Sequence, residues 1–246
     1  MRSNQRASVD QAMRVFDQQY RDLGMRSQRT YPNESLIRFL ASRYFDRPIG
    51  HREAIRVLEV GCGSGANLWM LAKEGFDTHG IDSSREGIAL AETHLKEKWA
   101  VSATLVVGSF TALPYADSCF DVVVDVVSLQ HLNLTDSAVA LADIARVMKP
   151  DGALFSHRLS DQSVMRESGR RVDSATLDNI SDAGMPLANN GPTSFWSPDL
   201  ARGMYARVGL AVESLERTGR TYPDGMFVEY LSLVGLKTRS APSTCA

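Results

Sequence analysis

The sequence predicts an α/β fold in which helices cover both faces of a mostly parallel, doubly wound sheet. Short apolar runs alternate with segments of helical apolar spacing between residues 57 and 157, a succession that implies crossover connections and parallel strands. The run at 120–127 is dense in valine and apolar on both faces, as expected for a central strand covered on each side. Three glycines at alternate positions link the first apolar run to its helix.

The amino-acid composition and net charge limit which kinds of molecule the protein is expected to bind. The 246 residues are 43% hydrophobic and 23% charged, enough for a substantial core, and the net charge of −2 gives no reason to expect nucleic acid. Residues 1–11 lack the apolar stretch of a signal peptide, and no run reaches the roughly 20 apolar residues of a membrane span. The three cysteines form no C-x-x-C pair, which favours reduced thiols. We expect a cytoplasmic protein that does not bind membranes; its oligomeric state is left open.

Two helices are expected before the first strand. Apolar residues from Ala12 to Tyr20 recur at helical spacing, and Pro32 opens a second pattern that runs through Leu36 to Tyr44. These helices either form a lid over the glycine loop or pack on the flank of the sheet. The sequence leaves both arrangements open.

The stretch from Val57 to Leu68 predicts a strand, a tight loop and a helix start. Glycine suits this loop because the backbone must reach φ values that other residues resist, and because a ligand can then approach bare backbone. Free N–H groups at the following helix start favour a negatively charged ligand group. The spacing of Gly61, Gly63 and Ala66 also satisfies the dinucleotide pattern, so the glycines alone do not identify the ligand.

A second strand, 78–82, ends in Asp82, about twenty residues beyond the first glycine. A carboxylate in that place can accept hydrogen bonds from both hydroxyls of a ribose. The alternative is that Asp82 caps the helix that begins near Arg85. Its position at the end of a strand favours the ribose.

Further strands are expected at 103–109, 120–127 and 153–157, with a turn at 149–152. Two last runs, 210–216 and 226–236, predict an antiparallel pair at one side of the sheet. Periodicity fails from 158 to 193, which indicates an irregular insert that covers a substrate or moves as a loop. Ligands of such sheets bind at the carboxyl ends of the strands, near which we expect Glu59, Asp82, Ser109, Asp125 and His157.

Four segments, taken in order, resemble the class I S-adenosylmethionine-dependent methyltransferases. They are 57–72, 80–82, 113–123 and 144–152. An acid two residues before the first glycine, here Glu59, is typical of that family and unusual in dinucleotide dehydrogenases. The resemblance implies a Rossmann-like sheet of seven strands with an N-terminal helical addition, and S-adenosylmethionine as cofactor. We therefore expect a helical cap at 1–48, a cofactor-binding domain at 49–238 and a flexible tail at 239–246.

The resemblance also implies a cofactor site, position by position. Glu59 and the loop backbone would face the methionine portion, Asp82 would hold the ribose, and Ser109 would lie near the adenine, where many relatives carry an acid. The full set is Glu59, Gly61, Cys62, Gly63, Gly65, Asp82, Ser83, Ser109, Phe110 and Asp125.

Transfer of a methyl group from a sulfonium depends mainly on positioning, and a base is needed only when the acceptor must lose a proton. The candidate bases are His131, His157 and Asp125, since an imidazole titrates near neutrality. His131 can equally cap the next helix or pack beneath it. The reaction requires no metal, and the histidines lack the spacing of metal ligands.

The sequence thus predicts a methyltransferase that acts on an O or N atom of a small molecule, such as a sugar or a bacterial metabolite. The identity of the methyl acceptor is not specified. Two alternatives remain: an NAD-linked oxidoreductase, which shares the glycine loop and the ribose acid, and a module that binds S-adenosylmethionine without turnover.

Overall fold

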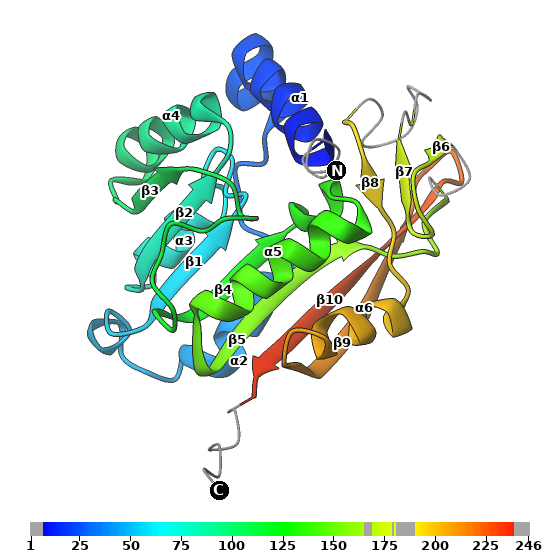
Figure 1. Cartoon of the computed structure of the whole chain (residues 1–246). Coiled ribbons are helices and arrows are strands. Elements are labelled where there is room, and N and C mark those ends of the chain that lie inside the picture. The colour runs from blue at the N-terminus through cyan, green and yellow to red at the C-terminus, as the bar shows by residue number, and fades with distance from the viewer. Residues whose placement is uncertain (1–6, 165–168, 179, 181–189, 239–246) are drawn as a thin grey trace, which may run out of the picture.

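A computed structural model describes residues 7–164, 169–178, 180 and 190–238 of the chain. Its centre is a seven-stranded sheet with the strand order β3-β2-β1-β4-β5-β10-β9 (Figure 1). The strands are β1 (Arg56–Val60), β2 (Asp77–Asp82), β3 (Thr104–Val107), β4 (Phe120–Val126), β5 (Met148–Leu159), β9 (Leu210–Thr221) and β10 (Phe227–Lys237). Strands β1 to β5 pair in parallel, whereas β10 pairs antiparallel with both β5 and β9. The predicted fold class is confirmed.

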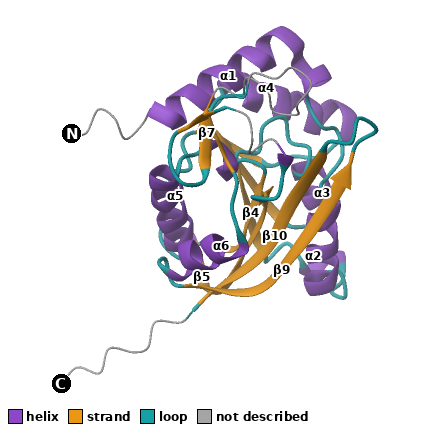
Figure 2. Cartoon of the chain, turned by 90° about the vertical axis from the view of Figure 1, so that its right-hand side faces the viewer, coloured by secondary structure: helices purple, strands orange, loops and turns teal. Residues whose placement is uncertain are grey.

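Helices cover both faces of this sheet. They are α1 (Ala7–Leu23), α2 (Glu34–Tyr44), α3 (Leu68–Lys73), α4 (Arg85–Thr93), α5 (Leu134–Val147) and α6 (Pro198–Ala206). Helices α5 and α6 pack on one face around one apolar cluster, and α2, α3 and α4 pack on the other face around a second cluster (Figures 1 and 2). Because both faces are covered, Val122, Val123 and Val124 of β4 are all buried, as their apolar run predicts.

Side-chain caps fix where four of the helices begin. Asn33, Ser84, Asn133 and Ser197 precede α2, α4, α5 and α6, and each side-chain oxygen accepts a hydrogen bond from a backbone N–H in the first turn. Each such cap contributes about 1 kcal/mol. The cap of α4 is therefore Ser84, and the alternative that Asp82 fills this role is wrong.

Some strand boundaries differ from those expected. Strand β3 ends at Val107 rather than at residue 109, and β5 begins at Met148 and includes residues 149–152, for which a turn was expected. The pairing of β4 with β5 shifts register at this point, and Asp151 has a φ of 63°. The turn signal thus corresponds to an irregularity inside a strand.

The described parts of the segment 158–193 are more regular than the sequence indicates. Strand β5 continues through Leu159, and β6 (Arg170–Arg171), β7 (Thr176–Asp178) and β8 (Thr193–Ser194) form a small antiparallel sheet. Leu159, Leu177, Phe195 and Val228 give this sheet its own apolar cluster. Its strands are only two or three residues long, too short for an alternating pattern to be recognised.

The two N-terminal helices have different places in the fold, so each alternative holds for one of them. Helix α2 packs on the flank of the sheet, where Leu36 and Leu40 are buried and the ring of Phe39 stacks on Phe155 at a centroid distance of 5.2 Å. Helix α1 instead crosses the end of the sheet above the glycine loop (Figure 2). The division into a helical cap at 1–48 and a cofactor-binding domain at 49–238 stays a prediction. The flexible tail expected at 239–246 lies outside the described residues.

Candidate active site

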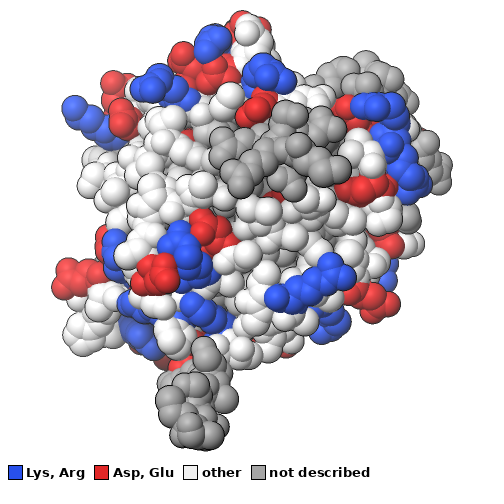
Figure 3. All heavy atoms as spheres, in the orientation of Figure 1, with Lys and Arg blue, Asp and Glu red and all other residues white. Residues whose placement is uncertain are grey.

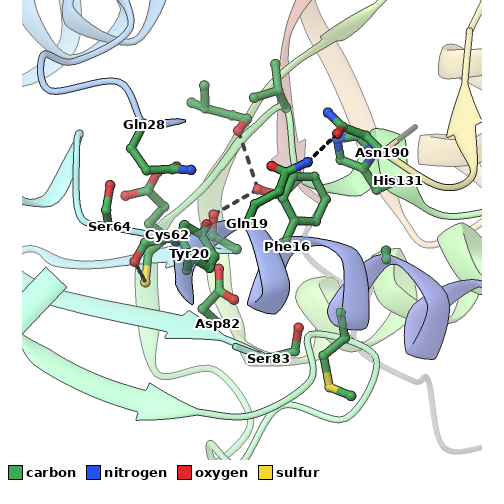
Figure 4. Close-up of a pocket in the computed structure, with 18 of the residues that line it drawn as sticks. Phe16, Gln19, Tyr20, Gln28, Cys62, Ser64, Asp82, Ser83, His131 and Asn190 are labelled. Atoms are coloured by element: carbon green, nitrogen blue, oxygen red, sulfur yellow. Dashed lines mark hydrogen bonds between the residues drawn. The ribbon is translucent and has the colours of Figure 1, made fainter. Parts of the chain in front are cut away.

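A cavity of about 330 Å³ lies between α1 and the carboxyl ends of β1, β2 and β4. Figure 4 shows residues from several separate parts of the chain converging on it. The wall comprises the glycine loop, the end of β2, the segments after β3 and β4, the loop 27–29, one face of α1 and Asn190. Its position agrees with the expectation that the ligand binds at the carboxyl ends of the parallel strands.

The glycine loop is held against β2 and leaves its backbone open to the cavity. The N–H groups of Gly61 and Cys62 both donate to the carbonyl of Ile81, at 2.8 and 3.1 Å. Gly61 and Gly63 have φ values of 65° and 50°, in the left-handed region that favours glycine. A Cβ on Gly61 would come within 2.3 Å of Ser128 Oγ, and one on Gly63 within 2.6 Å of the Tyr20 hydroxyl. Neither position accommodates a side chain.

Asp82 lies at the end of β2 with its carboxylate held by two backbone groups. Oδ2 accepts from the N–H of Gly63 and Oδ1 from the N–H of Ser84, each at 2.8 Å. Burial raises the pKa of this carboxyl, and these two hydrogen bonds oppose the rise. Each oxygen retains a second lone pair, so the carboxylate is oriented and can still accept hydrogen bonds from a diol.

The unpartnered carboxylate oxygen of Glu59 indicates whether the cavity suits S-adenosylmethionine. Its side chain is 2% exposed, and Oε1 accepts a hydrogen bond of 2.5 Å from Asn67 Nδ2. Oε2 is buried and has no hydrogen-bond partner among the described residues, an arrangement that costs free energy unless a ligand supplies a donor. Burial raises the pKa of Glu59 to about 8. An ammonium group is such a donor, so the residues present fit an amino-acid moiety.

Most of the predicted cofactor residues line the cavity together. Those that do are Glu59, Gly61, Cys62, Gly63, Asp82, Ser83, Ser109 and Phe110. Gly65 is not among them; it faces α4, where an added Cβ would contact Ala91 at 3.4 Å. The Ser109 hydroxyl lies 2.7 Å from Thr111 Oγ1, so its hydrogen-bonding capacity is already partly used.

The structure does not place Asp125 in the cavity wall. This carboxylate is fully buried; Oδ1 accepts from the N–H groups of Ser128 and Leu129, and Oδ2 accepts from Ser156 Oγ. Val127, which lies between Asp125 and Ser128 in the chain, has a φ of 57°. This left-handed conformation costs a β-branched residue about 1–3 kcal/mol. Asp125 thus holds the strained turn that carries Ser128 to the glycine loop, where Ser128 Oγ donates to the carbonyl of Gly61 at 2.9 Å.

His131 lines the cavity on the opposite side from the glycine loop. Its Nδ1 lies 3.3 Å from the carbonyl of Pro192, so this nitrogen carries the proton, and Nε2 lies 3.5 Å from the amide nitrogen of Gln130. Burial lowers its pKa to about 4. The imidazole is therefore neutral near pH 7, with a lone pair on Nε2. It does not cap α5, since Asn133 does.

His157 is not part of the cavity wall, although the charge of the wall residue Arg29 acts on it. Its Nδ1 lies 2.9 Å from Ser232 Oγ, and its ring stacks on Tyr230 at 4.7 Å. Burial, together with the positive charge of Arg29, lowers its pKa to about 4. His157 does not belong to the cavity wall, so the structure brings only His131, of the three candidate bases, to the cavity.

Sequence reasoning did not assign several residues of the wall to the site. Phe16, Gln19 and Tyr20 come from α1, and Gln28 and Arg29 come from the loop that follows it. The apolar spacing of α1 signalled a buried face but not what it covers. The loop is polar and aperiodic, so its sequence carried no signal for the site. Within the described residues, no group of three His, Cys, Asp or Glu side chains forms a metal site.

The fold and the cavity suit a nucleoside that bears an amino-acid group. Residues 57–152 match the sequence model of a family described as a methyltransferase domain. A ubiquinone biosynthesis O-methyltransferase of Agrobacterium fabrum is 32% identical over 111 residues, which cover 44% of this chain and 43% of that protein. An uncharacterised protein of Haemophilus influenzae is 28% identical over 188 residues, covering 72% of this chain and 70% of that protein.

Solved structures agree in fold. A S-adenosylmethionine-dependent methyltransferase from Methanosarcina mazei superposes with a TM-score of 0.65 at 20% identity, covering 79% of this chain and 99% of that one. The 1,6-didemethyltoxoflavin-N1-methyltransferase of Burkholderia thailandensis, solved with S-adenosylhomocysteine, gives 0.62 at 16% identity and covers 95% and 87%. The match of residues 57–152 to a methyltransferase domain and these shared folds support the S-adenosylmethionine-dependent methyltransferase family and the cofactor expected from the sequence. The chain spans less than half the length of the ubiquinone and menaquinone relatives that it matches.

Proposed function

We propose that this protein transfers the methyl group of S-adenosylmethionine to an oxygen or nitrogen atom of a small molecule. The observation that carries the proposal is the pair of buried carboxylates on one cavity wall. Glu59 has an oxygen without a partner, and Asp82 is oriented with lone pairs to spare. They suit the two polar ends of the donor, its ammonium group and its ribose hydroxyls.

In this proposal the other predicted cofactor residues complete the donor site. The bare backbone of Gly61 and Gly63 allows close approach, Phe110 packs near Gly61, and Ser83 and Ser109 line the cavity around the adenosine. Arg29 lines the cavity from the loop after α1, and its guanidinium suits the donor's carboxylate. Asp125 takes part through the turn that it holds rather than by contact with the donor.

The chemistry expected of the chain's own residues is limited. Bound S-adenosylmethionine supplies an electrophilic methyl group. Helix α1 covers the cavity and excludes water, which strengthens the electrostatic interactions within it. Nε2 of neutral His131 faces the side-chain amide nitrogen of Gln130 at 3.5 Å, so it can accept the proton of an acceptor hydroxyl only if that hydroxyl displaces the Gln130 amide. His157 is not a wall residue of the cavity, and most of the rate enhancement is expected from positioning.

Calorimetry with S-adenosylhomocysteine and with NAD tests the donor assignment. We expect S-adenosylhomocysteine to bind, and Asp82→Ala to weaken that binding by about 1–3 kcal/mol, the cost of leaving buried polar partners unpaired. Asp77→Ala is the matched control, since Asp77 begins the same strand at its far end from the cavity. NAD binding without S-adenosylhomocysteine binding would reject the proposal, and unchanged affinity of a folded Asp82→Ala variant would remove the ribose role.

We further propose a small-molecule acceptor and a cytoplasmic location. Lys and Arg are interspersed with Asp and Glu on the face drawn in Figure 3, an arrangement that does not favour a polyanion on that face. Cys62 and Cys119 are free thiols, which suits a reducing compartment. None of the described helices combines the length and the low polarity needed to cross a membrane.

A further inference from the structure

Asn67 occupies the N-cap position of α3, but its side chain does not cap the helix. Asparagine is among the residues preferred at this position because its side-chain oxygen can accept a backbone N–H of the first turn, as that of Asn133 does at the start of α5. The side chain of Asn67 makes no such hydrogen bond. It is 1% exposed and is not among the wall residues of the cavity. This buried amide is therefore used for contacts outside its own helix.

These contacts join Glu59 to the segment that precedes α2. The backbone N–H of Asn33 donates to Asn67 Oδ1 at 2.9 Å, and Asn67 Nδ2 donates to Glu59 Oε1 at 2.5 Å. A backbone N–H can only donate, so the amide oxygen of Asn67 faces Asn33 and its nitrogen faces Glu59. Oε1 is then an acceptor in both protonation states of Glu59. The proton of the neutral form therefore lies on Oε2, the oxygen without a partner among the described residues.

The first turn of α3 also holds the loop that carries Arg29 to the cavity. Trp69 Nε1 donates to the carbonyl of Thr30 at 3.0 Å, one residue beyond Arg29. Arg29 lines the cavity and interacts electrostatically with Glu59. Asn67 and Trp69 thus attach this loop to the same helix end that holds the Glu59 carboxylate, so the positive and the negative group at the cavity are positioned together.

We propose that Asn67 is a positioning residue for the amino-acid end of the methyl donor. It holds Oε1 of Glu59 so that Oε2 is left for the donor's ammonium group, and through the backbone of Asn33 it keeps the loop of Arg29 beside the donor's carboxylate. The inference rests on the proposed methyltransferase function. Asn67 touches neither the donor nor the reacting atoms, so its effect lies in how tightly, and at which pH, the amino-acid end is bound.

Two ligands that differ in the amino-acid end test this role. 5′-Methylthioadenosine keeps the adenosine and the sulfur of S-adenosylhomocysteine but lacks its amino-acid group, and calorimetry at about pH 7.5 measures the affinity of both. We expect Asn67→Ala to weaken S-adenosylhomocysteine binding roughly tenfold, the scale of a buried acceptor left without its donor, and 5′-methylthioadenosine binding by less than about twofold. An equal loss for both ligands, or no loss for either, in a folded variant would overturn the inference.

Asn133→Ala is the matched control. The Asn133 side chain also bridges a backbone N–H and a carboxylate, since it accepts from the N–H of Asp136 at 2.8 Å and donates to Asp136 Oδ2 at 3.1 Å, but it is not a wall residue of the cavity. We expect this variant to have a lower melting temperature and an unchanged ratio of the two affinities. A changed ratio would attribute the effect to lost stability and overturn the inference. Failure of the wild type to bind S-adenosylhomocysteine would instead reject the proposed function.

The pH dependence of binding separates positioning from a general loss of structure. The titratable and charged groups that interact with Glu59 are Tyr20, Arg29, Cys62, Asp82 and Asp125. Asn67→Ala leaves all of them in place and removes a hydrogen bond that favours the carboxylate form of Glu59. The pH at which the affinity for S-adenosylhomocysteine levels off should therefore rise by about half a unit or more. In Glu59→Gln, which has no such proton, adding Asn67→Ala should leave the pH profile flat. An unshifted profile of Asn67→Ala would overturn the inference.

Discussion

At the scale of one residue, Glu59 has a buried carboxylate oxygen that lacks a hydrogen-bond donor and that a ligand can therefore bind. Its side chain is buried, Asn67 satisfies one carboxylate oxygen, and the other oxygen has no partner among the described residues. Burial raises its pKa to about 8, so in the free protein Glu59 is mostly protonated at pH 7. A ligand ammonium favours the carboxylate form. Donor binding is therefore expected to release a proton.

This proton release predicts a pH dependence of donor affinity. Because the free protein binds the proton more strongly than the complex, affinity for S-adenosylhomocysteine should rise with pH, by up to about tenfold per unit between pH 6 and 7, and level off towards pH 8. Calorimetry in buffers of different ionisation enthalpy measures both the affinity and the released proton. Glu59→Gln should lose this slope, and Asp77→Asn should keep it. A slope that survives in Glu59→Gln would assign the proton to another group.

At the scale of elements, α1 and α2 follow one another in sequence but have different functions in the fold. Helix α2 contributes Leu36, Phe39 and Leu40 to the core beside the sheet. Helix α1 is held across the cavity by side-chain hydrogen bonds to two other segments: Gln19 Nε2 donates to Asn190 Oδ1, and Asp17 Oδ1 accepts from Ser84 Oγ at 2.7 Å. Stability is therefore expected to depend on α2, and ligand binding on α1.

Two phenylalanines separate these roles. Phe39→Ala removes a buried ring that stacks on Phe155 and should lower the free energy of unfolding by about 3–5 kcal/mol. Phe16→Ala removes a half-buried ring at the cavity, with an expected loss of about 1 kcal/mol from its contact with His131. Urea unfolding measures both. Equal destabilisation would mean that α1 is as much a part of the core as α2.

At the scale of the whole molecule, the two buried histidines connect stability to pH. Burial lowers the pKa values of His131 and His157 to about 4, below the value of about 6.5 for an exposed histidine. Between these pH values the unfolded chain binds more protons than the folded one. Their contribution to stability is thus complete above pH 6.5 and is lost as the pH falls towards 4.

His157 allows this contribution to be measured at a histidine outside the cavity wall. His157→Phe keeps a ring to stack on Tyr230 but cannot take up a proton, so its melting temperature should fall less than that of the wild type between pH 6.5 and 5. His51→Gln, at an exposed position, should follow the wild type. An identical pH profile for His157→Phe and the wild type would show that His157 does not contribute to acid unfolding.

The sequence by itself determined the parts of this protein that depend on neighbouring residues. Alternating strand and helix patterns, the glycine loop and the acid after β2 depend on local backbone geometry, so the sheet, its parallel pairing and the residues Glu59 and Asp82 at the cavity were predicted. Only the tertiary structure decided which distant side chains meet. It moved Asp125 and His157 away from the cavity wall and brought Phe16, Gln19 and Arg29 into it, because the direction of a side chain and the path of a covering helix depend on packing between segments far apart in the chain.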